Sequence, residues 1–223
     1  MVAFQRARSA EQREVRRAAI LDTTAAMLAE MPVSAVALNE LSRRVGLAKS
    51  NVLRYFESRE AILLELLDRA WQRWLTELDE RLAREVDPHG TPRQRGDRFA
   101  EVLAGSLRPH PVLCDLCSAH TSVLEHNVSV GVAARSKRAT LDNITTLAGL
   151  ARRHLPELGA DDARKLAGAA VLLIGALWTS THPSASMLAA YETDPALAAL
   201  RLDFTTALAE SVAILISGIL SRA

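Results

Sequence analysis

The stretch that decides the fold runs from residue 38 to residue 56 and reads Leu38-Asn39-Glu40-Leu41-Ser42-Arg43-Arg44-Val45-Gly46-Leu47-Ala48-Lys49-Ser50-Asn51-Val52-Leu53-Arg54-Tyr55-Phe56. Its apolar positions predict a helix from about Leu38 to Val45 and a second helix of about seven residues from Ala48. Gly46 lies between them, where a left-handed residue ends a helix at little cost. Two short helices joined by a tight glycine turn form a helix-turn-helix, whose second helix can enter the major groove of DNA.

The residues on either side extend this motif into a small domain. Apolar residues at helical spacing predict a first helix from about Glu11 to Glu30, which Pro32 ends. Ser58 is typical of an N-cap, and it precedes a long fourth helix whose apolar positions keep a 3-4 spacing. We therefore expect a flexible basic arm over residues 1–11 and a three-helix DNA-binding domain over residues 12–57.

The rest of the chain, residues 58–223, reads as a larger helical body. Prolines, glycines and Asn127 separate its predicted helices. Beyond the long fourth helix these span about 93–107, 112–126, 130–154, 162–181 and 194–221. Alternating β-branched segments are missing from the sequence, so the predicted fold class is all-α with about nine helices.

Composition bounds the class of protein. Hydrophobic residues make up 49% of the chain and the net charge is +1, which argues against a histone-like polycation. Residues 1–60 hold ten Lys and Arg against seven Asp and Glu, whereas the remainder holds 17 against 19. Only two cysteines occur, residues 1–17 contain no apolar stretch long enough for a signal peptide, and the longest apolar run, Leu166–Trp178, is too short to span a membrane. We expect a cytoplasmic protein that has no membrane partner and binds a polyanion at one end.

The extended motif resembles the TetR family of transcriptional regulators. The resemblance covers about residues 13–67 without a gap. It rests on three segments: Ile20-Leu21-Asp22-Thr23-Thr24, Leu41-Ser42-Arg43-Arg44-Val45-Gly46-Leu47-Ala48 and Val52-Leu53-Arg54-Tyr55-Phe56-Glu57-Ser58-Arg59-Glu60-Ala61-Ile62-Leu63. Three positions depart from the family pattern. Ala37 and Ala48 replace the usual Ser or Thr caps, and Leu53 replaces an aromatic residue.

This resemblance implies a set of DNA contacts on the second helix of the motif and just beyond it. Lys49, Ser50, Asn51 and Arg54 would face base edges or phosphates. Tyr55 and Arg59 would contact the phosphate backbone. A cation in the first turn of the fourth helix opposes the helix dipole, and a phosphate partner would explain Arg59 there. The predicted DNA-binding residues are Asn39, Lys49, Ser50, Asn51, Arg54, Tyr55 and Arg59.

The resemblance also implies what the body does. We expect a ligand-responsive regulator, most simply a repressor, that binds a palindromic operator as a homodimer and is released by a small-molecule effector. The dimer would form through the apolar, small-residue-rich helices at 162–181 and 194–221. An apolar or amphipathic effector would bind near Trp74, Cys117, His120 and Trp178.

Two other functions compete with this interpretation. Cys114, Cys117 and His120 are spaced by three residues and could belong to a metal site or to an enzyme that uses Cys117 and His120. Semi-buried thiols that pack as small apolar groups are commoner, and the sequence has no evident catalytic triad or glycine-rich phosphate loop. A non-specific architectural DNA binder would be more basic. We therefore predict no enzymatic activity, no metal and no cofactor.

Overall fold

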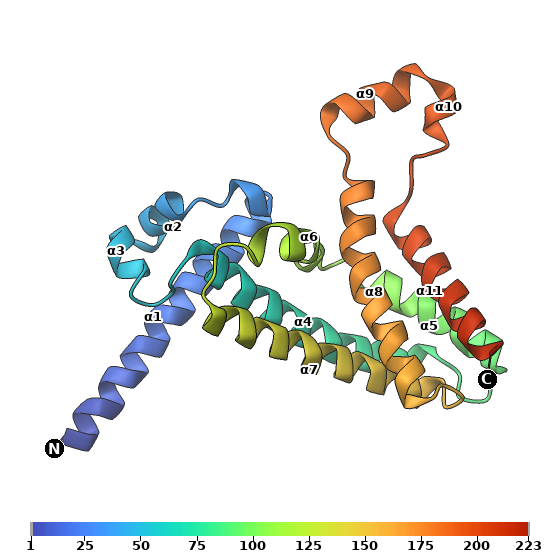
Figure 1. Cartoon of the computed structure of the whole chain (residues 1–223), viewed down its shortest axis with the longest axis horizontal. Coiled ribbons are helices and arrows are strands. Elements are labelled where there is room, and N and C mark those ends of the chain that lie inside the picture. The colour runs from blue at the N-terminus through green and yellow to red at the C-terminus, as the bar shows by residue number, and fades with distance from the viewer. Residues whose placement is uncertain (1, 223) are drawn as a thin grey trace.

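The protein is described here by a computed structural model that covers residues 2–222 and, within them, the side chains of residues 11–120, 123–194 and 196–222. All regular elements in this range are helical, which confirms the predicted fold class (Figure 1). The elements are α1 Val2–Glu30, a 3-10 turn η1 Val33–Ala35, α2 Leu38–Val45, α3 Lys49–Val52, α4 Arg59–Glu85, α5 Pro92–Ser106, α6 Pro111–Ala119, a π-helical turn η2 His120–Leu124, α7 Val130–His154, α8 Ala160–Thr181, α9 Ala185–Thr193, α10 Pro195–Ala198 and α11 Phe204–Leu220.

The first helix is longer than the sequence predicted. Helix α1 begins at Val2, so residues 2–11 are helical instead of a flexible arm, and residue 1 lies outside the described range. No proline or glycine interrupts Val2–Glu30, and this segment is rich in alanine, arginine and glutamate. These residues favour the helical conformation, so the sequence contains no signal that would stop α1 from extending back to Val2.

The final predicted helix, 194–221, is wrong in its extent. The structure places α9 and α10 before a shorter α11, which gives eleven α-helices in the described range instead of about nine. Each has its own start signal, because Ser184, Asp194 and Asp203 accept hydrogen bonds from backbone N–H groups in the first turns of α9, α10 and α11. Helices α9 and α10 form an arm that projects from the body (Figure 1).

Helices α1, α2 and α3 pack into the predicted three-helix domain. Gly46 has φ 71°, the left-handed conformation expected at the end of α2. Neither Ala37 nor Ala48 supplies a side-chain cap, as the sequence indicates. The core of this domain contains Ile20, Leu21, Leu41, Val52 and Phe56, all at most 4% exposed.

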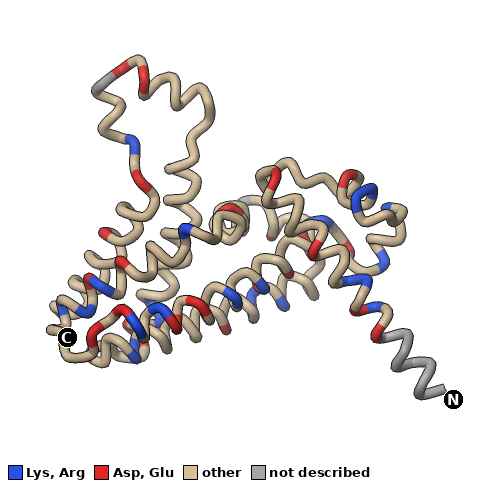
Figure 2. The backbone as a smooth tube through the Cα atoms, turned by 180° about the vertical axis from the view of Figure 1, so that it is seen from behind, with Lys and Arg blue, Asp and Glu red and all other residues tan. Residues whose placement is uncertain are grey.

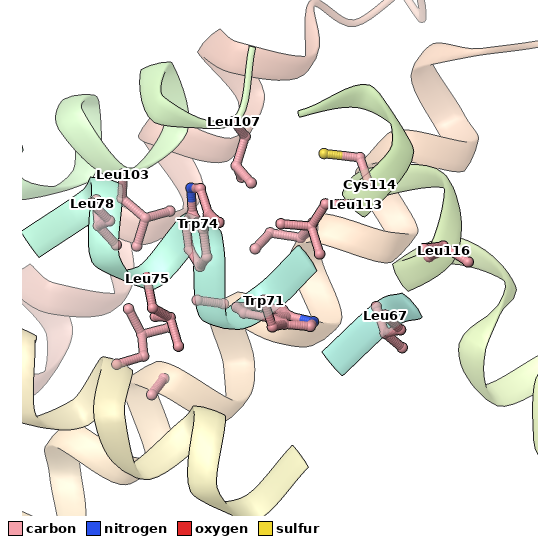
Figure 3. Packing of buried hydrophobic residues seen from close by; sticks show 14 of the residues in the cluster. Leu67, Trp71, Trp74, Leu75, Leu78, Leu103, Leu107, Leu113, Cys114 and Leu116 are labelled. Carbon is pink, nitrogen blue, oxygen red and sulfur yellow. The ribbon is translucent and has the colours of Figure 1, made fainter. Parts of the chain in front are cut away.

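The body is built around α4, which lies beside α7 and also contacts α5 and α6 (Figure 1). Ser58 caps α4 by accepting a hydrogen bond from Ala61 N, as predicted. Helices α8 and α11 complete the body by packing on α6, α7 and α5. The buried apolar side chains of the head and body form one continuous cluster, part of which Figure 3 shows.

Among the described residues, no single helix has the length and apolar character to cross a membrane. Helices α8 and α9 together meet those criteria but are bent by 67° relative to each other.

Candidate DNA-binding surface and ligand chamber

The predicted base-reading residues are exposed side chains of the head. Asn39 on α2 and Lys49, Ser50, Asn51 and Arg54 on and after α3 are all exposed. Helix α3 is shorter than predicted: after Leu53, the chain changes from i→i−4 to i→i−3 hydrogen bonds at Arg54 and Tyr55. The buried Phe56 then returns the backbone to the core. The predicted reading surface is thus one α-helical turn extended by a tighter turn.

The basic residues on this surface fall into two groups, according to whether they have an ion-pair partner. Arg43 and Arg44 are paired with Glu40 at 2.6 and 2.8 Å, and these hydrogen bonds lower the pKa of Glu40 to about 2. Within the part of the chain described, Lys49 and Arg54 have no ion-pair partner. Figure 2 shows basic segments gathered toward this outer end of the head. Lys49 and Arg54 are therefore free to meet phosphate or base acceptors.

An open cleft of about 980 Å³ separates the middle of α1, residues 11–19, from α3 and the turn that follows it. Arg13 and Arg16 line it from α1, while Asn51, Arg54 and Tyr55 line it from the other side. Three arginines, two amides and one carboxylate, Glu11, thus line one hollow from both sides. Their types suit a groove that holds a DNA strand.

Tyr55 and Arg59 are placed differently from the exposed set. Tyr55 is half-buried at the edge of the core, and its carbonyl accepts a 2.6 Å hydrogen bond from Arg17. Arg59 donates to the Val33 carbonyl at 3.1 Å, and its side chain is 22% exposed. The cation that appeared to need a phosphate thus has a partner within the protein. Arg59 does not line the cleft that Asn51, Arg54 and Tyr55 line, and its Nε is buried without a hydrogen-bond partner among the described residues.

The joint between head and body depends on residues that the sequence analysis did not single out. Glu57, in the link between α3 and α4, accepts hydrogen bonds from Ser129 N at 2.6 Å and Ser129 Oγ at 2.7 Å. Ser129 is also the N-cap of α7, and its two hydrogen bonds lower the pKa of Glu57. Arg17 lies 4.2 Å from the centre of the Phe56 ring and pairs with Glu65 on α4. Because each partner is far away in sequence, no local motif identifies these contacts.

A chamber of about 360 Å³ lies between α4, the end of α6, α7 and α8. Its apolar lining includes Leu64, Leu67, Trp71, Val171 and Leu172, and its polar lining includes Asp68, Ser118, His120, Thr140 and Asn143. A space of this size with mostly apolar walls and a few polar groups suits a small molecule.

The chamber contains half of the predicted pocket residues. Cys117 and His120 line it, but Trp74 and Trp178 do not. Trp74 is fully buried against α5 and donates to Ser106 Oγ at 2.8 Å (Figure 3). Trp178 instead packs against His182 and Phe204, with ring centroids at 3.9 and 5.2 Å. Trp71 lines the chamber instead, one helical turn before Trp74 on α4, and the two rings contact each other with centroids 4.9 Å apart.

The chemistry of the two thiols does not resemble that of a reactive or metal-binding site. Burial raises the pKa of Cys114 to about 12 and raises that of Cys117 further. Burial also lowers the pKa of His120, whose Nε2 lies 3.1 Å from Glu125 Oε1 without hydrogen-bond geometry. In the described residues, no three His, Cys, Asp or Glu side chains are grouped so that they could hold a metal ion.

The fold and exposed surface define a helix-turn-helix regulator with a large helical body. The model for tetR-family bacterial regulatory proteins matches residues 20–66, and the model for the tetracyclin repressor-like C-terminal domain matches residues 68–223. The chain therefore belongs to the TetR family of transcriptional regulators. No curated protein matches its sequence.

Solved structures share the fold across nearly the whole chain. A possible TetR family transcriptional regulator from Streptomyces coelicolor A3(2) is 18% identical with a TM-score of 0.59, covering 93% of this chain and 100% of that one. A TetR transcriptional regulator from Rhodococcus sp. RHA1 is 11% identical with a TM-score of 0.56, covering 93% and 96%. The fatty acid degradation regulator FadR from Bacillus halodurans is 13% identical with a TM-score of 0.53, covering 90% and 97%.

Proposed function

We propose that this protein is a cytoplasmic, ligand-responsive repressor that binds a palindromic operator as a homodimer. The observation that carries the DNA-binding part is the exposed surface around α3. Lys49, Asn51 and Arg54 are exposed there, and neither Lys49 nor Arg54 has an ion-pair partner in the described part of the chain. Asn51 would read a base edge, because a carboxamide can pair with adenine at two atoms. Lys49 and Arg54 would contact guanine or phosphate, and Tyr55 would contact phosphate at the edge of the site.

The structure changes the role that we propose for Arg59. Its guanidinium donates to the Val33 carbonyl, and Val33 N in turn donates to Asp115 on α6 at 2.7 Å. Arg59 therefore lies in a chain of contacts that ends on the body. We propose that Arg59 positions the head on the body and contacts no phosphate.

A homodimer accounts for apolar side chains that the single chain leaves in solvent. Leu172 on α8 is 69% exposed and Ile214 on α11 is 71% exposed, and these two helices pack against each other. Association of two copies through α8 and α11 would cover these residues, as a closed two-fold interface does. Ala170, also on α8, is only 1% exposed, so it belongs to the core of each subunit and not to the proposed interface.

The chamber in the body supports the ligand-responsive part. Its walls belong to α4 and α6, and both helices contact the head through α1. A ligand that fits the chamber better in one arrangement of these helices would shift the population toward that arrangement. The two heads of a dimer would then fit the two operator half-sites less well.

The enzyme hypothesis receives less support from the same residues. Thiols whose pKa is raised stay protonated at neutral pH and are poor nucleophiles. The neighbouring His120 is neutral for the same physical reason, namely burial. Turnover of a substrate that is lost in Cys117→Ala would favour the enzyme over the regulator.

Selection of bound DNA from a pool of random duplexes tests the proposal. We expect enrichment of an inverted repeat whose half-sites are related by the two-fold axis of the dimer. Recovery of unrelated sequences, or of none, would count against a sequence-specific regulator.

A further inference from the structure

A second chamber, of about 440 Å³, lies where the head meets the body. Arg13, Arg17 and Tyr55 line it from the head, and Leu64 and Arg135 line it from the body. We call it the junction chamber, and the 360 Å³ space described above the body chamber. A ligand in the junction chamber would contact both parts of the molecule.

The two chambers follow one another along the same pair of helices. They share Leu64 and Asp68 on α4, and Ser136 and Ala139 on α7. On α4 the lining continues from Ala61 in the junction chamber to Trp71 in the body chamber. This length of helix corresponds to about 15 Å at about 1.5 Å per residue. Helix α7 runs alongside (Figure 1). Together they border a path long enough for an extended molecule.

The two ends of this path differ in chemistry. At the body end, Leu67, Trp71 and Val171 provide apolar walls. At the junction end, the lining carries the cations Arg13, Arg17 and Arg135 and the carboxylates Glu57, Glu65 and Asp68. An apolar chain therefore fits one end, and a charged or polar group fits the other.

The charge that a ligand group would need at the junction end follows from which of the lining residues already have hydrogen-bond or ion-pair partners. Arg17 pairs with Glu65, Glu57 accepts two hydrogen bonds from Ser129, and Asp68 accepts one from Asn143 at 3.0 Å. Arg13 and Arg135 form no hydrogen bond or ion pair with any described side chain, although the charge of Arg135 contributes to the lowered pKa of Glu57. The groups at this end that donate no hydrogen bond within the described chain are thus guanidinium groups, which prefer carboxylate or phosphate oxygens.

We infer that the two chambers form one elongated site for an anionic amphiphile. Its apolar chain lies in the body chamber, and its anionic end group is bound by Arg13 and Arg135. This inference rests on the proposed function only in taking such a molecule to be the effector. Because Arg13 belongs to the head and Arg135 to the body, the end group contacts both, so its binding depends on how the head is held.

The test measures binding to the full-length protein in the absence of DNA, by titration calorimetry and tryptophan fluorescence. The probes are laurate, dodecyl phosphate, dodecanol and dodecyltrimethylammonium, all kept below their micelle concentrations. We expect the two anions to bind roughly tenfold or more tightly than dodecanol, since a hydrogen bond to a charged group contributes about that factor. Comparison of laurate with dodecyl phosphate shows which anion the site prefers. Equal binding of the anions and dodecanol would overturn the inference.

Three variants distinguish recognition of the anionic end group from non-specific apolar binding. Arg13→Gln and Arg135→Gln should each weaken laurate binding roughly tenfold and leave dodecanol binding unchanged. Arg138→Gln is the matched control, because Arg138 is exposed one turn further along α7 and lines neither chamber. Circular dichroism checks that each variant is folded. If all three variants bind laurate like the wild type, the guanidinium assignment is wrong.

The connection between the chambers has its own test. Affinity should rise from hexanoate to laurate, and Ala139→Phe, at the shared wall, should weaken laurate more than hexanoate. Equal affinity for both chain lengths, with no effect of Ala139→Phe, would mean that the chambers are separate. DNA selection with the same preparation distinguishes the two proposals. If the protein selects an operator but binds charged and neutral probes equally, only the amphiphile site is refuted. If it prefers the anionic probes but selects no operator, only the regulator is refuted.

Discussion

Replacement of Gly175 by alanine should disturb the contact between α6 and α8 that borders the body chamber. A Cβ atom at Gly175 would lie 2.9 Å from Cys117 O, 3.2 Å from Cys117 C and 3.4 Å from Ser118 Cα. All three neighbours are backbone atoms, so no side-chain rotation can relieve the clash. Such overpacking costs about 1–3 kcal/mol, whereas the change from glycine to alanine within a helix gains about 1 kcal/mol. The net expectation is a loss of about 0–2 kcal/mol.

Gly149→Ala provides the matched control for this substitution. Gly149 is an exposed residue of α7, and a Cβ there would meet nothing within 4 Å. It should therefore stabilise the protein by up to about 1 kcal/mol. Urea unfolding at one fixed protein concentration measures both variants, because dimer stability depends on concentration. The difference between them isolates the overpacking cost of about 1–3 kcal/mol. Equal stabilisation by both substitutions would refute the close approach of α8 to α6.

Three further predictions follow from the joint, the dimer and the thiols. The lowered pKa of Glu57 means that its contact with Ser129 stabilises the protein above the ordinary glutamate pKa of about 4.3, and that this contribution is lost as the pH falls toward the lowered value. Glu57→Gln should therefore flatten this part of the pH dependence of unfolding, and an unchanged profile would argue against the contact. Leu172→Asp or Ile214→Asp should yield monomers in sedimentation, while Leu141→Asp, at a 60% exposed position on α7, should not. A monomeric wild type would contradict the dimer. Iodoacetamide at pH 8 should alkylate the native protein far more slowly than the urea-unfolded protein, because burial raises the pKa of Cys114 to about 12 and that of Cys117 further. Equal rates would be inconsistent with the raised pKa values of the thiols.

The parts of the fold that depend on local signals could be predicted from the sequence. Helix α2 spans the predicted Leu38–Val45, and α7 spans the predicted 130–154. Gly46 adopts a left-handed conformation and Ser58 caps α4, as the pattern indicates. Each of these features is encoded within a few neighbouring residues, which is why a single sequence is enough to locate it.

Features that depend on distant partners could not be predicted. The family resemblance predicts a phosphate contact for Arg59, and its hydrogen bond to Val33, 26 positions away, is invisible in a local pattern. The sequence predicts Trp74 as a pocket residue, but Trp74 packs on α5 and donates to Ser106, whereas Trp71, one turn earlier, lines the body chamber; the packing of α5, α7 and α8 around α4 decides this. In place of the predicted helix 112–126, the structure has α6 followed by a π-helical turn at His120–Leu124, and no residue pattern in the sequence predicts this turn.

The central claim is that the surface around α3 reads a DNA sequence, and the most direct test is a titration of Asn51→Ala against the selected operator and a scrambled duplex. Asn51 is exposed and belongs to the surface that also presents Lys49 and Arg54. We expect Asn51→Ala to cost about 1–3 kcal/mol per half-site on the operator and almost nothing on the scrambled duplex, with an unchanged salt dependence. An equal loss on both duplexes, or no loss on either, would contradict the assignment of this surface as the reader of DNA sequence.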